Sequence, residues 1–168
     1  AVTVATVKAL NVFYDLEMDT LTQFKIAALA HLAVQGNGSC GDIAASCYGG
    51  WIAFSTFDSQ WVKEKQAQWS LSTLLETDWP MLSIQPLEVP KNLRLVIGWT
   101  GSPASTSDLV DQVHQSKEVA ESAYQTFLKD SRECVEEMIA GFTNKNIPVI
   151  KQMITKNRSL LNTLSSIT

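Results

Sequence analysis

The chain is poor in cysteine and histidine, the residues most used by disulfide frameworks and zinc sites. Its 168 residues include three cysteines, Cys40, Cys47 and Cys134, and two histidines, His31 and His114. The cysteines are odd in number, and no cysteine and histidine stand at a metal-ligand spacing. We therefore predict neither a disulfide framework nor a zinc site, and we expect the reduced thiols of a cytoplasmic protein.

Long apolar runs and runs of basic charge are also missing. No stretch approaches the roughly 20 apolar residues that a membrane-spanning helix needs. The N-terminus lacks the basic-then-apolar layout of a signal peptide. The net charge is −4 with mixed signs, which excludes a basic surface for nucleic acid or an anionic membrane. With 45% hydrophobic residues the chain has enough apolar material for a core. We expect a soluble protein without nucleic-acid or membrane partners, of undetermined oligomeric state.

What the chain does have is a glycine-rich segment in its first third. Residues 35–51 read Gln-Gly-Asn-Gly-Ser-Cys-Gly-Asp-Ile-Ala-Ala-Ser-Cys-Tyr-Gly-Gly-Trp. The three glycines within residues 36–41 exclude a regular element, because each adds backbone freedom that folding must remove. Residues 43–48 are small and apolar, which predicts a short helix with Asp42 in its first turn. The second glycine pair ends that helix and precedes a strand at 51–55.

The chemistry of this segment has two interpretations. A glycine-rich loop that enters a helix directs backbone N–H groups at one point, where the helix dipole favours an anion such as phosphate. A carboxylate beside that point, Asp42, is unfavourable unless it handles a proton or a metal ion. In the alternative, Asp42 caps the helix and the glycines form a turn. Cys40 has no obvious base nearby, so a small buried residue is favoured over a nucleophile.

The remaining pattern predicts helices with a few strands. The first helix has apolar residues on more than one face, so we expect it to be buried among other elements. Trp61 and Trp69 are expected to cover a core edge, and Gly141 to mark the C-terminal cap zone of a helix. The expected helices cover residues 1–14, 21–34, one or two segments within 58–77, 108–140 with a break near 115–116, and the residues from 147 onward. The expected strands cover 51–55, 82–89 and 93–99, the last being the strongest.

A second group of polar residues follows the strand at 93–99. Residues 100–106 read Thr-Gly-Ser-Pro-Ala-Ser-Thr and precede the helix expected from 108. A strand followed by glycine and hydroxyl residues at a helix N-terminus is typical of ligand-binding turns. Ser105 or Thr106 also fits a helix cap, and capping is compatible with binding.

Residues 35–51 and 98–106 together resemble the bacterial phosphomevalonate kinase family of the GHMP small-molecule kinase superfamily. The resemblance covers essentially the whole chain. It implies the two-domain α+β fold of GHMP kinases, here incomplete at both ends and helix-rich with a few antiparallel strands. Residues 1–90 would be the C-terminal part of the N-terminal (ribosomal S5 domain 2-like) domain. Residues 91–168 would begin the C-terminal domain, with the boundary near Pro90.

The resemblance also implies an activity and its residues. The family transfers the γ-phosphoryl group of ATP to 5-phosphomevalonate, giving 5-diphosphomevalonate in isoprenoid biosynthesis, with Mg²⁺ accompanying the nucleotide. Asp42 matches the family's acidic residue near the phosphoryl acceptor, as base or electrostatic orienter, and Ser39 and Gly41 would shape that side of the site. The residues that would lie along the acceptor substrate are Ser102, Ala104, Ser105 and Thr106.

The chain also departs from the family. The nucleotide loop of the form Pro-x-x-x-Gly-Leu-Gly-Ser-Ser-Ala is absent, and so are the N-terminal strands and the late glycine-rich motif. We therefore expect an internal fragment whose ATP-binding residues lie outside this chain and which is inactive alone. Three alternatives remain: mevalonate kinase or diphosphomevalonate decarboxylase of the same superfamily, a non-catalytic interaction module built on the helices after residue 108, and a thiol enzyme using Cys40.

Overall fold

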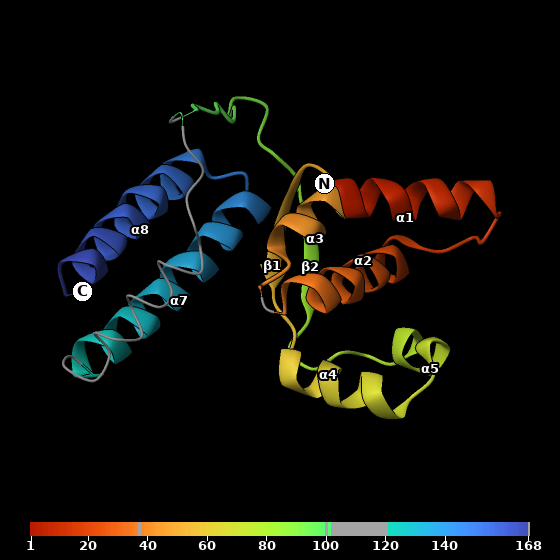
Figure 1. Cartoon of the computed structure of the whole chain (residues 1–168). Helices are drawn as coiled ribbons and strands as arrows, with labels where there is room; N and C mark the ends of the chain where they lie inside the picture. The colour runs from red at the N-terminus through yellow and green to blue at the C-terminus, as the bar shows by residue number, and fades with distance from the viewer. Residues whose placement is uncertain (37, 100, 102–120, 168) are drawn as a thin grey trace. The chain divides into compact units, whose positions relative to one another are not determined.

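The computed structural model describes residues 1–36, 38–99, 101 and 121–167 (Figure 1). The chain divides into two compact units, Ala1–Leu87 and Glu88–Thr168. Over the described residues the fold is helix-rich with one two-stranded antiparallel sheet, which confirms the predicted α+β class. The division between the units lies close to the boundary expected near Pro90.

The first unit contains most of the elements. Its helices and strands are α1 (Val2–Phe13), α2 (Thr20–Gln35), α3 (Gly41–Tyr48), β1 (Trp51–Ser55), α4 (Ser59–Gln68), α5 (Leu71–Glu76) and β2 (Ser83–Leu87). Side chains in the preceding turns fix where three helices begin: Asp19, Asp58 and Ser70 accept backbone N–H bonds at the starts of α2, α4 and α5. Such N-caps satisfy amides that have no carbonyl partner within the helix. Each of these elements lies where the sequence pattern predicted one.

The two strands form the sheet of the first unit. β1 and β2 run antiparallel, with Trp51 opposite Leu87 and Ile52 opposite Pro86. Proline lacks the N–H that a central strand position needs, so it suits a strand with one open side. The two strands expected at 51–55 and 82–89 are thus confirmed, with β2 slightly shorter than the pattern suggested.

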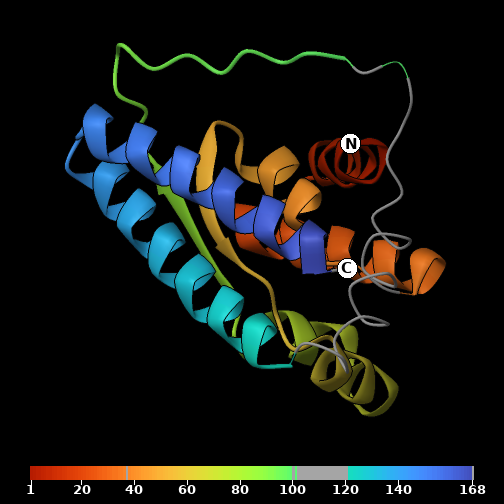
Figure 2. The same cartoon turned by 90° about the vertical axis from the view of Figure 1, so that its left-hand side faces the viewer.

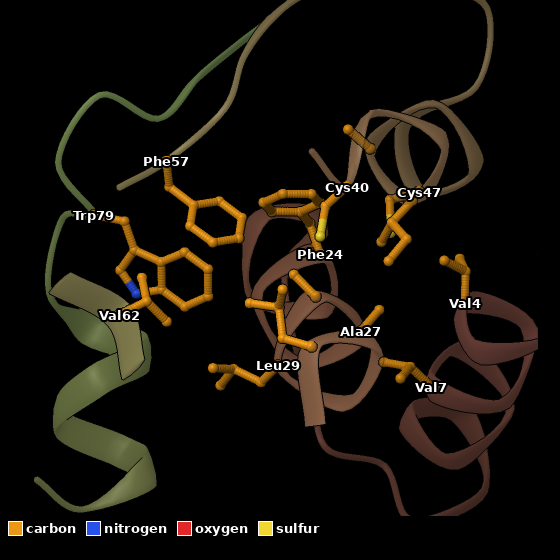
Figure 3. Packing of buried hydrophobic residues seen from close by; sticks show 14 of the residues in the cluster. Val4, Val7, Phe24, Ala27, Leu29, Cys40, Cys47, Phe57, Val62 and Trp79 are labelled. Atoms are coloured by element: carbon orange, nitrogen blue, oxygen red, sulfur yellow. The ribbon is translucent and has the colours of Figure 1, made fainter. Parts of the chain in front are cut away.

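The core of the first unit is arranged around α2. Phe24, Ala27 and Ala28 are fully buried on this helix, at positions that share one helical face. The ring of Phe57 lies between those of Phe24 and Trp79, and both contacts are edge-to-face (Figure 3). These aromatic contacts place the β1–α4 connection and the residues after α5 against one side of α2.

The first helix is less buried than its sequence suggested. Only Val4 and Val7 of α1 are buried, and Figure 3 shows both directed at α2 and α3. Val2, Val12 and Phe13 are each about 80% exposed. Within the described residues the main packing partners of α1 are α2 and α3, and one face of the helix suffices for these contacts. The expectation of a helix buried among several elements was wrong for this part of the chain.

The second unit contains a helical hairpin. α7 (Glu121–Thr143) and α8 (Ile147–Ile167) lie side by side in antiparallel orientation (Figures 1 and 2). Cys134, Phe142, Ile150 and Met153 are buried between them. The Cys134 thiol donates to the Met153 carbonyl at 3.2 Å, so this cysteine is part of the hairpin's packing.

Gly141 lies in the C-terminal cap zone of its helix, as its sequence position indicated, although the helix continues past it. α7 continues to Thr143, and the left-handed residue that closes it is Lys145, at φ 54°. The N–H of Asn146 donates to the Gly141 carbonyl at 2.8 Å and that of Lys145 to Phe142, which is a Schellman motif. A Cβ on Gly141 would lie 3.1 Å from Ile150 Cγ1. The glycine therefore allows α8 to approach α7 closely.

The strand expected at residues 93–99 does not form. This segment is irregular in the structure, and Leu95, Val96, Ile97 and Trp99 are 65–87% exposed. A strand requires a hydrogen-bonded neighbour, and in the described part of the chain only β1 and β2 are paired. The helix expected at 108–140 is confirmed from residue 121 onward. Its first part and the expected break near 115–116 lie outside the described residues.

Candidate functional site

The N-terminus of α3 carries the residues that the sequence pattern selected. Cys40 is the N-cap, in the left-handed conformation at φ 58° and ψ 18°, and its side chain makes no cap bond. Its carbonyl accepts the Ala44 N–H at 2.9 Å and so closes the first turn. Asp42 is the second residue of the helix. The interpretation of Asp42 as the helix cap was therefore wrong, because the chain turns into the helix two residues earlier.

Asp42 presents its carboxylate to solvent. The residue is exposed, and among the described residues no side chain bonds to its carboxylate, although its backbone carbonyl accepts from Ser46 Oγ at 2.7 Å. A carboxylate in the first turn also gains from the positive end of the helix dipole. The arrangement leaves an accessible negative charge beside backbone N–H groups that have no helical partner.

Cys40, two residues before Asp42, has a buried thiol. Its side chain is 1% exposed. Burial, and to a lesser degree the negative charge of Asp42, raise the pKa of the Cys40 thiol to about 11. The thiolate is the nucleophilic form of cysteine, and it is scarce at neutral pH under these conditions. The geometry thus argues against the alternative of a thiol enzyme at this position.

The other two predicted residues of the segment lie beside Asp42. The Gly41 N–H donates to Ser39 Oγ at 3.4 Å, and the Ser39 carbonyl accepts from Thr56 Oγ1 at 2.8 Å. A Cβ on Gly41 would stay at ordinary contact distance, 3.5 Å from Phe54 Cδ1. Gly38 is more constrained, because its φ is +123° and a Cβ there would lie 3.1 Å from His31 Nε2. His31 therefore packs against the loop.

The second predicted group lies outside the described residues. Ser39, Gly41 and Asp42 are adjacent in the structure, whereas nothing is described of the segment that would line the acceptor substrate. The residues in question are Ser102, Ala104, Ser105 and Thr106.

Three contacts of the loop and helix were missed in the sequence. Lys63 Nζ donates to the Gly36 carbonyl at 2.8 Å, Thr56 holds Ser39, and Lys8 Nζ donates to the carbonyls of Ser46 and Cys47 at 3.3 and 3.0 Å. The partners are separated by 17 to 39 residues. One sequence feature could have indicated the two lysine contacts. α2 and α3 have no basic residue in their own last turns, where a cation is favourable, so a cation from another element could bind there.

Apart from this helix N-terminus, the first unit has a cavity of about 340 Å³ that is lined in part by Lys25, Tyr48 and Asp78. The Lys25 ammonium is buried and already donates to the carbonyls of Leu75 and Thr77 at 2.7 and 2.8 Å. Its burial lowers the pKa of Lys25, although Asp78 and Asp19 oppose that shift. The Lys25 ammonium bonds to carbonyls at the end of α5 and lies near the Asp78 carboxylate. The charges that line the cavity therefore favour neither an anion nor a cation.

Neither a membrane span nor a metal cluster is found in the described ranges. None of their helices combines the length and the apolar character needed to cross a bilayer. No three His, Cys, Asp or Glu side chains in these ranges lie close enough to share a metal ion. In the predicted site, Asp42 is thus an acidic residue that stands apart from any group of three potential metal ligands in these ranges.

Comparison with known proteins gives the family. The model for the GHMP kinases N-terminal domain matches residues 1–50. A curated phosphomevalonate kinase from Streptomyces sp. (strain CL190) is 38% identical over 141 residues, which is 84% of this chain and 38% of that protein. The chain belongs to the GHMP kinase superfamily. Within it, the chain is similar to phosphomevalonate kinases over most of its length.

Solved structures agree with this assignment. The crystal structure of a Lin0012 protein from Listeria innocua matches 98% of this chain and 46% of its own, with TM-score 0.89 and 44% identity. The Streptococcus pneumoniae phosphomevalonate kinase in complex with phosphomevalonate and AMPPNP matches 97% of this chain and 47% of its own, with TM-score 0.81 and 30% identity. The chain therefore spans less than half the length of these relatives.

Proposed function

We propose that the protein carrying this chain is an ATP-dependent phosphomevalonate kinase. It would transfer the γ-phosphoryl group of ATP to 5-phosphomevalonate and form 5-diphosphomevalonate for isoprenoid biosynthesis. The similarity to phosphomevalonate kinases supports this substrate, and one such relative is described with phosphomevalonate and an ATP analogue. In this proposal residues 1–90 belong to the N-terminal domain of the enzyme and residues 91–168 begin its C-terminal domain.

The observation that carries the proposal is the exposed carboxylate of Asp42 at the N-terminus of α3, to which no side chain of the described residues bonds. Phosphoryl transfer has a loose transition state that depends mainly on positioning and on the balance of charge. A carboxylate can orient the acceptor phosphate of 5-phosphomevalonate and, when that phosphate is the monoanion, accept its proton. The acceptor oxygen then bonds to the γ-phosphorus of ATP while the bond from that phosphorus to the departing ADP oxygen breaks. Backbone N–H groups at the same helix end would stabilise negative charge on the phosphoryl oxygens.

Mg²⁺ fits this arrangement in a limited way. The ion commonly binds nucleotide phosphates with one or two protein carboxylates and keeps several waters. Asp42 is one accessible carboxylate, so most of the ligands would come from the nucleotide. When bound, Mg²⁺ would neutralise charge on the transferred phosphoryl group. The substrate-side roles of Ser39, Gly41, Ser102, Ala104, Ser105 and Thr106 are part of the proposal.

The test is Asp42→Asn in the whole protein, which removes the proton acceptor and keeps the size of the side chain. We expect kcat for 5-phosphomevalonate to fall by about 10²–10⁴-fold, the usual contribution of a general base. The unfolding free energy should change by no more than about 1 kcal/mol, the size of a first-turn dipole interaction. Glu64→Gln, an exposed carboxylate on α4, is the matched control and should leave kcat unchanged. An Asp42→Asn protein with near-normal turnover would refute the role.

Substrate choice is tested separately. The whole protein should be assayed with mevalonate, 5-phosphomevalonate and 5-diphosphomevalonate, since the sibling enzymes of the superfamily prefer the first or the last. For this chain alone, calorimetric titration should show weak or no binding of MgATP. Tight binding would contradict the expectation that its ATP-binding residues lie elsewhere.

A further inference from the structure

Three helices in the first unit have lysines from other elements at their C-terminal ends. α2, α3 and α5 carry no basic residue in their own last turns. Lys63 of α4 donates to the carbonyl of Gly36, the residue that caps α2. Lys8 of α1 donates to Ser46 and Cys47 at the end of α3. Lys25 of α2 does the same at the end of α5. Each lysine meets carbonyls that a helix end leaves without an intrahelical donor.

Two of these three lysines act on the segment that carries Asp42. Lys63 holds its start at Gly36, where the chain leaves α2, and Lys8 holds its end, where α3 stops. Between them, Thr56 Oγ1 donates to the Ser39 carbonyl. Lys25 acts on α5 instead. Side chains from α1, from α4 and from the β1–α4 connection thus bond to the described part of this loop and helix, residues 36 and 38–48.

We propose that Lys8 and Lys63 are positioning residues that fix the two ends of this segment and thereby set the place of Asp42 in the catalytic site. The inference rests on the proposed role of Asp42. Neither lysine would touch the substrate. Each would act through the backbone, Lys8 by fixing the direction of α3 and Lys63 by fixing the entry to the loop.

The segment needs such support for physical reasons. α3 has eight residues, and an isolated helix of this length is unstable in water. The loop before it contains glycines and a non-glycine residue at positive φ, Cys40, which the surrounding contacts must maintain. A displacement of about 1 Å in a reacting group can reduce turnover roughly 100-fold. A small loss of rigidity in the segment that carries Asp42 should therefore lower kcat measurably.

The test compares Lys8→Met and Lys63→Met in the whole protein with Lys65→Met. Lys65 is also on α4, but its ammonium lies 4.9 Å from the centroid of the Trp69 ring, and no carbonyl bond of this group is found in the described residues. We expect kcat to fall about 10-fold or more in the first two variants with a smaller change in KM, because the reacting group Asp42 is displaced while four of the six proposed substrate-side residues lie outside this segment. Lys8→Arg keeps a donor for both carbonyls and should recover most of the loss.

Hydrogen exchange gives a readout that needs no turnover. In Lys8→Met the amides of residues 43–49 should exchange at least about fivefold faster, because loss of even one of the two Lys8 hydrogen bonds, at ordinary strength, predicts that change. Lys63→Met should accelerate exchange at residues 36–41, and Lys65→Met should alter neither range. Unchanged exchange together with kcat within twofold of the parent, or a kcat loss that Lys8→Arg does not relieve, would overturn the inference.

The result can be separated from the test of the proposed function. If Asp42→Asn abolishes turnover and the lysine variants do not affect it, the positioning inference alone fails. If Asp42→Asn leaves turnover intact while the exchange rates rise as expected, the lysines fix the segment but its proposed function is wrong.

Discussion

The buried lysine of α2 gives a sharp test of how the first unit is held together. Lys25 is 3% exposed, and its ammonium donates to the carbonyls of Leu75 and Thr77. The same nitrogen lies 5.7 Å from the centroid of the Trp79 ring. Lys25→Met keeps most of the aliphatic stem and removes every donor. We expect the protein to be clearly less stable, because α5 then loses the cation at its C-terminal end.

The size of the effect follows from the contacts. An unsatisfied buried acceptor costs about 1–3 kcal/mol, and the substitution leaves two carbonyls without their donor. Leu75 and Thr77 are half-buried, so water will reach them in part and the lower end of that range applies. The variant also removes the cost of burying a charge, which offsets part of the loss. A net loss of about 1–2 kcal/mol remains, which for a domain of this size lowers Tm by roughly 5–10 °C.

Urea unfolding followed by tryptophan fluorescence measures this loss. Trp79 is buried next to Lys25 and its indole donates to the Leu74 carbonyl at 2.9 Å, so its signal reports on the same region. Lys65→Met is the control for removal of a half-buried lysine whose ammonium lies over the Trp69 ring and meets no carbonyl of the described residues, with an expected change within about 1 kcal/mol. If Lys25→Met costs no more than Lys65→Met, the two hydrogen bonds do not support α5 and the reasoning is wrong.

The pH dependence provides an independent check. Burial lowers the pKa of Lys25 below its ordinary value of 10.5, so in the window just below 10.5 the unfolded chain binds more protons at this residue than the folded one. Stability from this group therefore rises as pH increases through that window. Because Lys25→Met lacks the titrating group, the difference in unfolding free energy between parent and variant should grow over the same range.

The remaining predictions concern one cap and one thiol. Asp19 accepts the Thr22 N–H at 2.7 Å at the start of α2, so Asp19→Ala should cost about 1 kcal/mol in urea unfolding near neutral pH. This bond lowers the pKa of Asp19 below 3.8, so the stability that Asp19 contributes should be lost as pH falls through its pKa in the folded protein. The difference in unfolding free energy between the parent and Asp19→Ala should therefore vanish in acid. Cys40, buried and with its pKa raised to about 11, should resist iodoacetamide at pH 7.5 until the protein is denatured, and rapid labelling of the native protein would contradict this.

Local sequence determined much of the first unit. Asp19, Asp58 and Ser70 stand directly before helices and cap them, and the helix boundaries follow. The glycines around α3 break the chain on both sides of a short apolar segment, which gives both the helix and the strand after it. These features depend on residues a few positions apart, so a pattern along the chain records them.

Errors and omissions arose where a neighbour decides the structure. Residues 93–99 are rich in strand-forming side chains, but a strand forms only beside another strand, and the sequence does not record which one. Gly141 was expected in a helix cap zone and lies in one, but the sequence does not record that its lack of a Cβ serves the contact with Ile150 on the next helix. In α1 apolar residues occur on several faces, but only Val4 and Val7, which face α2 and α3, are buried. The packing partners therefore determine which apolar residues are buried.

The candidate site shows the same division within a few residues. Asp42, Ser39 and Gly41 were predictable because a glycine-rich loop, a helix start and a carboxylate follow one another in the chain. The groups that hold them were not, since Lys8 and its α3 partners are 38 and 39 residues apart and Thr56 acts on Ser39 from 17 residues away. A lysine on a polar helix face has the same local pattern whether it meets solvent or a carbonyl. The residues that would carry the chemistry of this segment can therefore be predicted from neighbouring positions in the sequence. The rigidity of the segment depends on tertiary contacts, and variants of Lys8 and Lys63 test how much those contacts contribute.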